Sequence, residues 1–283
     1  MKKILLPTDF SENSWNAITY ALQLFKNEEC TFFLLNTFAP AVYQVEYLLV
    51  MPQPDETLNV YKESSLRNLE MLKERMQTEF SNPKHSIETI SIFNTLVHQI
   101  NEEIQDKSID YIIMGTKGAT GAREILFGSN TVFVLKKVKC PIIAVPETFT
   151  YESPHEILFP TDYGINYQDE HIQPLLNLTG NNVARINILH VDKGRGLTEY
   201  QERNKQQLES YFKHSAYLFH SVQNESVQEA IANFQLKVRV NLLVMLNNKH
   251  SFFENLFFKS TINQIGFHLN IPFFVIPTKL GKK

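Results

Sequence analysis

Residues 114–132 read MGTKGATGAREILFGSNTV and carry the clearest information about the fold. The apolar run before this stretch, residues 110–114, predicts a buried strand, and the residues from Ser129 onward predict a helix. Four glycines fall within fourteen positions here, whereas residues 1–114 contain none. Because glycine lets the backbone approach an anion closely, a glycine-rich turn between a strand and a helix predicts a phosphate-binding loop. The alternative is a glycine-rich turn without a ligand. The spacing G-x2-G-x9-G-S matches neither a Walker A loop nor a dinucleotide fingerprint.

Composition indicates a globular protein of two ordinary domains, with 283 residues and a net charge of −3. No apolar run reaches the roughly 20 residues of a membrane span. The apolar start of the chain ends at Pro7, which favours a first strand over a signal peptide. Cys30 and Cys140 suggest no disulfide framework, so a cytoplasmic location is predicted. The mixed charges predict no nucleic-acid partner and no membrane partner.

The chain contains an internal repeat. KILLPTD at residues 3–9 recurs as EILFPTD at 156–162, and CPIIAVP at 140–146 recurs as IPFFVIP at 271–277. Repeats of this length are tandem domains rather than solenoid modules. The first domain is predicted to span residues 1–147 and the second residues 154–278. The two copies are expected to form a pair within the chain, with the strands at 141–145 and 272–276 pairing antiparallel. A homodimer is left open.

Each copy alternates strands and helices, which predicts an α/β fold with a five-stranded parallel sheet covered by helices on both faces. In the first copy the expected strands lie near 3–7, 31–37, 86–93, 109–114 and 141–145, and the helices near 13–26, 56–80, 95–106 and 129–138. Parallel sheets bind ligands at the carboxyl ends of their strands, where the strand order reverses. Asp9, Asn36 and Gly115 follow three such strands, so we expect them to converge on one crevice.

The copies differ in two places. The first copy has a longer segment between Thr37 and His85, whose apolar part, residues 41–51, is expected to pack on the other copy or on a partner chain. In the second copy the glycine loop is lost. Gly115, Gly118 and Gly128 correspond to Leu246, Lys249 and Lys259, and only Ser129 persists, as Ser260. The phenylalanines between residues 252 and 258 are expected to fill the vacated pocket or to cover a domain interface, with a site for a hydrophobic ligand as the alternative.

With these features the chain resembles tandem universal stress proteins. The resemblance rests on the P-T-D sequence after the first strand, the G-x2-G-x9-G-S loop and the closing C-P-I-I-A-V-P strand. It implies the family's adenine nucleotide α-hydrolase-like fold. The ATP-binding members of the family carry this glycine spacing, so the resemblance also implies that the first copy binds ATP or a related nucleotide such as AMP or ADP. The second copy, which has lost all three glycines, is predicted to be degenerate.

The resemblance also implies a role for each residue of the site. The adenine and ribose side would be lined by Pro7, Thr8 and Asp9, the base contacted by Thr37, the ribose bordered by Met114 and Gly115, and the phosphates held by Gly118, Gly128, Ser129 and Asn130. Lys117 and Arg123 are candidates for neutralising phosphate charge, with a solvated surface position as the alternative. Asp9 and Ser129 also suit helix capping, and both roles can hold at once.

The predicted function is a regulatory or protective stress response in which nucleotide occupancy is the signal. The sequence shows no nucleophile–base pair and no cluster with metal-ligand spacing, so neither efficient catalysis nor a protein-bound metal is predicted, although Mg²⁺ could accompany ATP. Slow ATP hydrolysis or self-phosphorylation is left open. Two other classes compete with this prediction: an adenylyl-transferring enzyme of a related fold, and an interaction module that binds no nucleotide.

Overall fold

The computed structural model describes residues 1–38, 56–116, 128–180, 184–248 and 270–278. These residues form two compact units, the first ending at Cys140 and the second beginning at Pro141. The first unit contains β1 (Lys2–Pro7), α1 (Glu12–Leu24), β2 (Cys30–Thr37), α2 (Glu56–Glu79), β3 (His85–Ile92), α3 (Leu96–Lys107), β4 (Tyr111–Gly115) and α4 (Ser129–Lys137). The second contains β5 (Ile142–Val145), β6 (Glu156–Pro160), α5 (Asp169–Thr179), β7 (Arg185–Asp192), α6 (Glu199–Tyr211), β8 (Ala216–Gln223), α7 (Val227–Lys237), β9 (Leu242–Asn247) and β10 (Phe273–Pro277).

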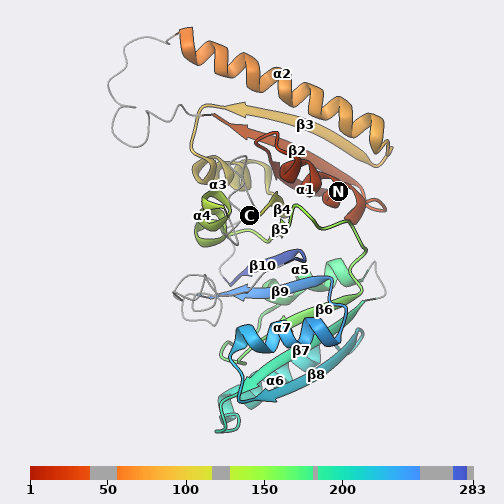
Figure 1. The fold of residues 1–283 in the computed structure, drawn as a ribbon, viewed down its shortest axis with the longest axis vertical. Coiled ribbons are helices and arrows are strands. Elements are labelled where there is room, and N and C mark those ends of the chain that lie inside the picture. Colours follow the sequence, from red (N-terminus) through yellow and green to blue (C-terminus); the bar gives the residue numbers. More distant parts are fainter. Residues whose placement is uncertain (39–55, 117–127, 181–183, 249–269, 279–283) are drawn as a thin grey trace, which may run out of the picture. The chain divides into compact units, whose positions relative to one another are not determined.

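The strands of the first unit lie in the order β3-β2-β1-β4, and each neighbouring pair is parallel (Figure 1). β1 lies in the middle, with Leu5 opposite Phe33 of β2 and Ile112 of β4. The chain steps from β1 to β2 to β3 and then returns across β1 to form β4. Since such crossovers are right-handed, α1 and α2 cover one face of the sheet, and α3 and α4 cover the other. The strand order therefore reverses beside β1, which has β2 on one side and β4 on the other.

The second unit has the strand order β5-β10-β9-β6-β7-β8. β6, β7, β8, β9 and β10 run parallel to one another, whereas β5 pairs with β10 in antiparallel fashion, with Ile143 opposite Phe274. The antiparallel pairing expected from the sequence is thus confirmed. β5 comes from the first sequence repeat, yet it belongs to the second compact unit.

The predicted α/β fold is confirmed, because buried strands alternate with helices as the sequence pattern indicates. Ile4, Leu5 and Leu6 of β1 are fully buried, as are Ile112 and Ile113 of β4. Strands of this kind, covered on both faces, have near-continuous apolar sequences. The predicted helix 129–138 corresponds to α4, which spans Ser129–Lys137.

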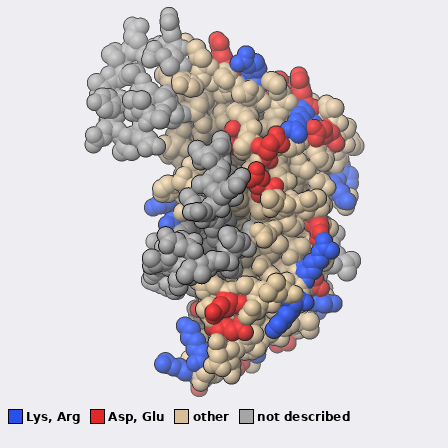
Figure 2. Space-filling view, viewed as in Figure 1, with Lys and Arg blue, Asp and Glu red and all other residues tan. Residues whose placement is uncertain are grey.

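The structure describes some of the remaining sequence features and not others. The apolar segment 41–51 and the phenylalanines between residues 252 and 258 lie outside the described residues. Cys30 and Cys140, the two cysteines of the chain, are both buried and are not joined by a disulfide bond. Within the described ranges, no helix is long and apolar enough to cross a membrane. On the face shown in Figure 2, basic and acidic side chains of the described residues lie interspersed.

We predict that Phe274→Ala destabilises the second unit by about 3–5 kcal/mol, because it leaves a cavity where a fully buried ring packs on the β5–β10 pair. Leu236→Ala is the matched control: Leu236 of α7 is 86% exposed, and its truncation should change stability by less than about 0.5 kcal/mol. Urea unfolding followed by circular dichroism measures both. Equal stability of the two variants would contradict the buried β10.

Candidate functional site

A tight turn follows β1 and is held by the side chain and backbone of Thr8. The Thr8 N–H donates to the Leu35 carbonyl at 2.9 Å, which keeps the end of β1 against β2. The Thr8 hydroxyl accepts the Phe10 N–H at 3.0 Å and lies 3.0 Å from the Ser14 hydroxyl. Phe10 has a φ of 63°, in the left-handed region, where a residue with a side chain costs about 1–2 kcal/mol. The hydrogen bonds of Thr8 offset that cost.

Asp9 is exposed, and one carboxylate oxygen, Oδ1, accepts two hydrogen bonds from Ser11: from its hydroxyl at 2.6 Å and from its N–H at 3.2 Å. Ser11 in turn is the N-cap of α1, because its side chain accepts the Ser14 N–H. Asp9 therefore orders the capping residue rather than capping the helix itself.

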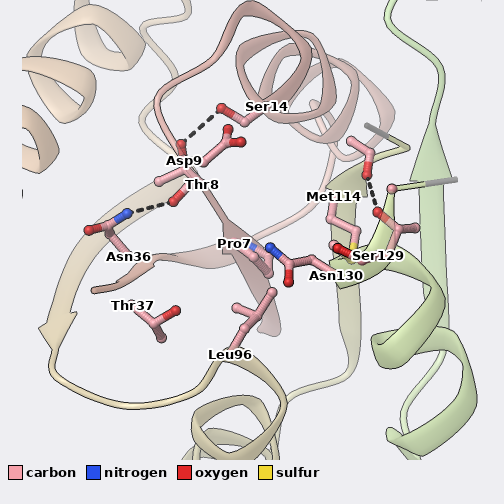
Figure 3. Close-up of a pocket in the computed structure, with 13 residues that line it drawn as sticks. Pro7, Thr8, Asp9, Ser14, Asn36, Thr37, Leu96, Met114, Ser129 and Asn130 are labelled. Carbon is pink, nitrogen blue, oxygen red and sulfur yellow. Dashed lines mark hydrogen bonds between the residues drawn. The ribbon is translucent and has the colours of Figure 1, made fainter. Parts of the chain in front are cut away.

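Asn36, near the end of β2, connects this turn to the neighbouring strand. Its amide nitrogen donates to the Thr8 carbonyl oxygen at 2.8 Å (Figure 3). Its amide oxygen accepts the Ser65 hydroxyl of α2 at 2.7 Å. Only 8% of Asn36 is exposed, so both hydrogen bonds form in a buried environment, where leaving either group unpaired would be costly.

Gly115 ends β4, and the reason for glycine at this position is packing against α1. A Cβ on Gly115 would lie 2.3 Å from Oδ1 and 2.7 Å from Cγ of Asn13, which is buried. The Gly115 carbonyl also accepts the Thr131 hydroxyl at 2.9 Å, which ties β4 to the start of α4. The contact with Asn13 therefore accounts for glycine at this position without a ligand.

Helix α4 begins with Gly128 as its N-cap, and no side chain of the described residues caps it. The Gly128 N–H donates to the Thr116 carbonyl at 2.7 Å, which closes the loop at its base. The φ of Gly128 is −61°, which any residue adopts, so backbone conformation does not require glycine at this position. The first turn holds no acidic residue, whereas the last turn holds Lys136 and Lys137. A helix N-terminus of this composition favours an anion.

These elements surround one cavity of about 360 Å³, at the carboxyl ends of β1, β2 and β4. The side chain of Asn130 extends from α4 towards Pro7 and Leu96 (Figure 3). The cavity is lined by Pro7, Thr8, Asp9, Ser14, Asn36, Thr37, Leu96, Met114, Gly115, Gly128, Ser129, Asn130 and Thr131. Its volume lies in the range of small-molecule sites, about 300–1,000 Å³.

The structure brings nine of the twelve residues predicted for the site to this cavity: Pro7, Thr8, Asp9, Thr37, Met114, Gly115, Gly128, Ser129 and Asn130. The other three, Lys117, Gly118 and Arg123, lie outside the described residues. Among the residues that are described, no group of three or more His, Cys, Asp and Glu side chains is arranged to hold a metal ion.

The model of the universal stress protein family matches residues 1–146, about half of the chain. The chain belongs to the universal stress protein family. Its sequence is 32% identical over 157 residues to universal stress protein MJ0577 of Methanocaldococcus jannaschii, covering 51% of this chain and 94% of that protein. It is 27% identical over 148 residues to universal stress protein YxiE of Bacillus subtilis, covering 50% of this chain and 97% of that protein.

The fold is shared over the whole length with a solved structure. A universal stress protein from Archaeoglobus fulgidus superposes with a TM-score of 0.68 at 17% identity, and the match covers 98% of each chain. At this identity the likeness shows the fold alone. It extends over both units, whereas the curated relatives match about half of the chain.

In this universal stress protein the turn after β6 repeats the turn after β1, but a buried tyrosine, Tyr167, takes the place of Ser14 beside it. Thr161 takes the place of Thr8: its N–H donates to the Leu189 carbonyl, and its hydroxyl accepts the Tyr163 N–H. The partner of the Thr161 hydroxyl is the Tyr167 hydroxyl, at 2.6 Å, where the first unit has Ser14. Tyr163 and Tyr167 are 2% and 1% exposed. Burial raises the pKa of both hydroxyls, so they stay protonated and able to donate.

The expected convergence of Asp9, Asn36 and Gly115 on one crevice is confirmed, because all three line the cavity. Ser14, Leu96 and Thr131 also line it, although the sequence did not predict them. The exchange of Ser14 for Tyr167 was readable from the two repeats, because both follow their P-T-D sequence at the same distance. A small hydroxyl in one copy and a buried ring in the other indicate space in the first and its loss in the second. Leu96 and Thr131 carried no such signal.

We predict that Gly115→Ala lowers the free energy of unfolding of the first unit by about 1–3 kcal/mol, because the new methyl group overlaps the buried Asn13 side chain. Trp15, the single tryptophan, packs on Phe80 and Arg75 in this unit, so its fluorescence in urea reports the change. Asn13→Ala should rescue the variant, with a coupling energy of about 0.5–3 kcal/mol. Additive effects of the two substitutions would show that this contact does not explain the glycine.

Proposed function

We propose that the first copy, residues 1–147, binds one adenine nucleotide, either ATP or AMP/ADP, and that occupancy of this site, rather than catalysis, is the output of this stress-response protein. One observation carries the proposal. The cavity lies where the strand order reverses and is bounded by the N-terminus of α4, which no described side chain caps. Nucleotides bind parallel α/β sheets at this position, with phosphate at a helix N-terminus.

The cavity residues suit the two ends of a nucleotide. Asp9 is acceptor-only when ionised, so it favours ribose hydroxyls or an exocyclic amine and disfavours phosphate. Pro7, Thr8 and Thr37 accompany it on the base and ribose side. At the other side, the backbone N–H groups of the first turn of α4 and the side chains of Ser129 and Asn130 offer donors to phosphate. The helix dipole adds about 0.3–1 kcal/mol for an exposed anion and up to about 2 kcal/mol for a partly buried one.

Binding without catalysis is supported by the chemistry of the lining. Asp9 is the one titratable side chain among the described residues that line the cavity. A hydrolytic or adenylyl-transferring site needs a general base or a cationic group placed at the reacting phosphate. For this reason we propose a regulatory or protective role.

We further propose that the second copy, residues 154–278, binds no nucleotide. Its buried Tyr163 and Tyr167 occupy the space beside the P-T-D turn, and the glycines of the loop are replaced in its sequence. The cytoplasm is the proposed setting, which fits two cysteines that are not joined by a disulfide bond, since reducing compartments keep cysteines as thiols.

Calorimetric titration of the full chain with ATP, ADP and AMP tests the proposal directly. We expect saturation at about one nucleotide per chain, and at 100 times the dissociation constant the ligand should stabilise the first unit by about 2.7 kcal/mol. Two equivalents of bound nucleotide would contradict the asymmetry. The absence of binding by all three would contradict the proposed function.

A second experiment copies the second unit into the first. Ser14→Tyr should abolish nucleotide binding, because the new ring enters the cavity. It takes the place beside the turn that the buried Tyr167 ring takes in the second unit. Ser14→Ala is the matched control: it removes the same hydroxyl but leaves the cavity open, so affinity should fall by no more than about tenfold. Urea unfolding of both variants confirms that the first unit is folded. Binding by folded Ser14→Tyr at wild-type affinity would place the site elsewhere.

A further inference from the structure

A chain of three side-chain hydrogen bonds leads from the interior of the first unit to the cavity. The Ser91 hydroxyl of β3 lies 2.8 Å from the Ser65 hydroxyl of α2. The Ser65 hydroxyl lies 2.7 Å from the amide oxygen of Asn36, and the amide nitrogen of Asn36 lies 2.8 Å from the Thr8 carbonyl oxygen. Two of these residues, Asn36 and Thr8, line the cavity. These hydrogen bonds therefore join α2 and β3 to the P-T-D turn.

The chemistry of the groups fixes the direction of every hydrogen bond. A carbonyl oxygen only accepts, so the NH₂ group of Asn36 must face Thr8. The amide oxygen of Asn36 then faces Ser65, whose hydroxyl must donate. Because the Ser65 proton is committed, Ser91 is the donor to Ser65. Ser65, Asn36 and Thr8 are 4%, 8% and 7% exposed, so water does not readily replace a lost partner.

The second unit holds its turn in the same way with different residues. The Nδ1 atom of His190 lies 3.0 Å from the Thr161 carbonyl oxygen, where the first unit has Asn36. The helix that follows β7, α6, also supports the turn: Asn204 donates to the Tyr163 carbonyl and Gln201 to the Asp162 carbonyl, each at 2.8 Å. Support of this turn from the neighbouring strand and helix thus recurs although the residues differ.

We propose that Asn36 is a positioning residue of the nucleotide site, and that Ser65 of α2 fixes the orientation of its amide. The inference rests on the proposed function. The Thr8 carbonyl belongs to the peptide group that joins Thr8 to Asp9. The hydrogen bond from Asn36 therefore sets the direction in which the chain leaves β1 and the place at which the Asp9 carboxylate meets the ligand. Preorganised contacts of this kind raise affinity because the ligand does not have to order them.

Calorimetric titration with ATP of four full-length variants tests this role. Asn36→Asp replaces the donor with a carboxylate that repels the Thr8 carbonyl, and it should weaken binding by more than about tenfold. Ser65→Ala removes the donor to the Asn36 amide oxygen and should weaken binding by about three- to tenfold. Asn36→His introduces the residue type that His190 supplies in the second unit, keeps a donor and should restore binding to within about threefold of wild type. Ser86→Ala is the matched control, because Ser86 lies in β3 and bonds Thr31 near the other end of the strands.

The outcomes separate this inference from the proposed function. Trp15 fluorescence in urea without nucleotide gives the stability of each variant, so that a loss of affinity in a folded protein is distinguished from unfolding. Weakened binding by Asn36→Asp and Ser65→Ala, with wild-type binding by Ser86→Ala, supports the positioning role. Wild-type affinity in folded Asn36→Asp and Ser65→Ala overturns it and leaves the proposed function standing. If the unmodified protein does not bind ATP, ADP or AMP, both fail together.

Discussion

The reversal of strand order beside β1 is the constraint on which the site depends. Right-handed crossovers carry the chain from β1 to β3 on one face of the sheet and bring it back to β4 on the other. The loops that follow β1 and β4 consequently leave the sheet towards opposite faces. A space remains between these two loops at the carboxyl ends of the strands. The P-T-D turn occupies one side of that space and the N-terminus of α4 the other. Neither element forms a site without the reversal.

The two copies share the backbone geometry of the turn after the first P-T-D strand but differ in the side chains beside it. Both turns place an aromatic residue at positive φ, Phe10 at 63° and Tyr163 at 55°, and in both the threonine hydroxyl accepts its N–H. This repeated strain belongs to the geometry of the turn, because both copies have it although the side chains beside the turn differ. The difference between the copies lies in the side chains beside the turn, where Ser14 and Asn36 of one correspond to Tyr167 and His190 of the other.

Much of the fold was predictable because burial on both faces leaves a clear pattern in sequence. The strands, the helices and the antiparallel pair of β5 and β10 follow from apolar runs and from the need to cover a sheet edge. The site was predictable only where a motif marked it. Gly115 was recognised, but the reason for glycine is the contact with Asn13, which no pattern in the sequence encodes. Ser14 and Leu96 escaped prediction because periodicity shows which residues are buried and not which of them border empty space.

The exchange between Ser14 and Tyr167 shows how a copy can hold a buried ring beside the turn and keep its fold. The Thr161–Tyr167 hydrogen bond takes the place of the Thr8–Ser14 one, so the threonine of the turn keeps a hydroxyl partner while a ring is added next to it. Burial of an aromatic side chain stabilises the fold by about 1.5–3 kcal/mol. Selection for stability alone therefore favours the filled copy. An open cavity in the first copy forgoes that gain, which is expected where a ligand supplies the missing contacts.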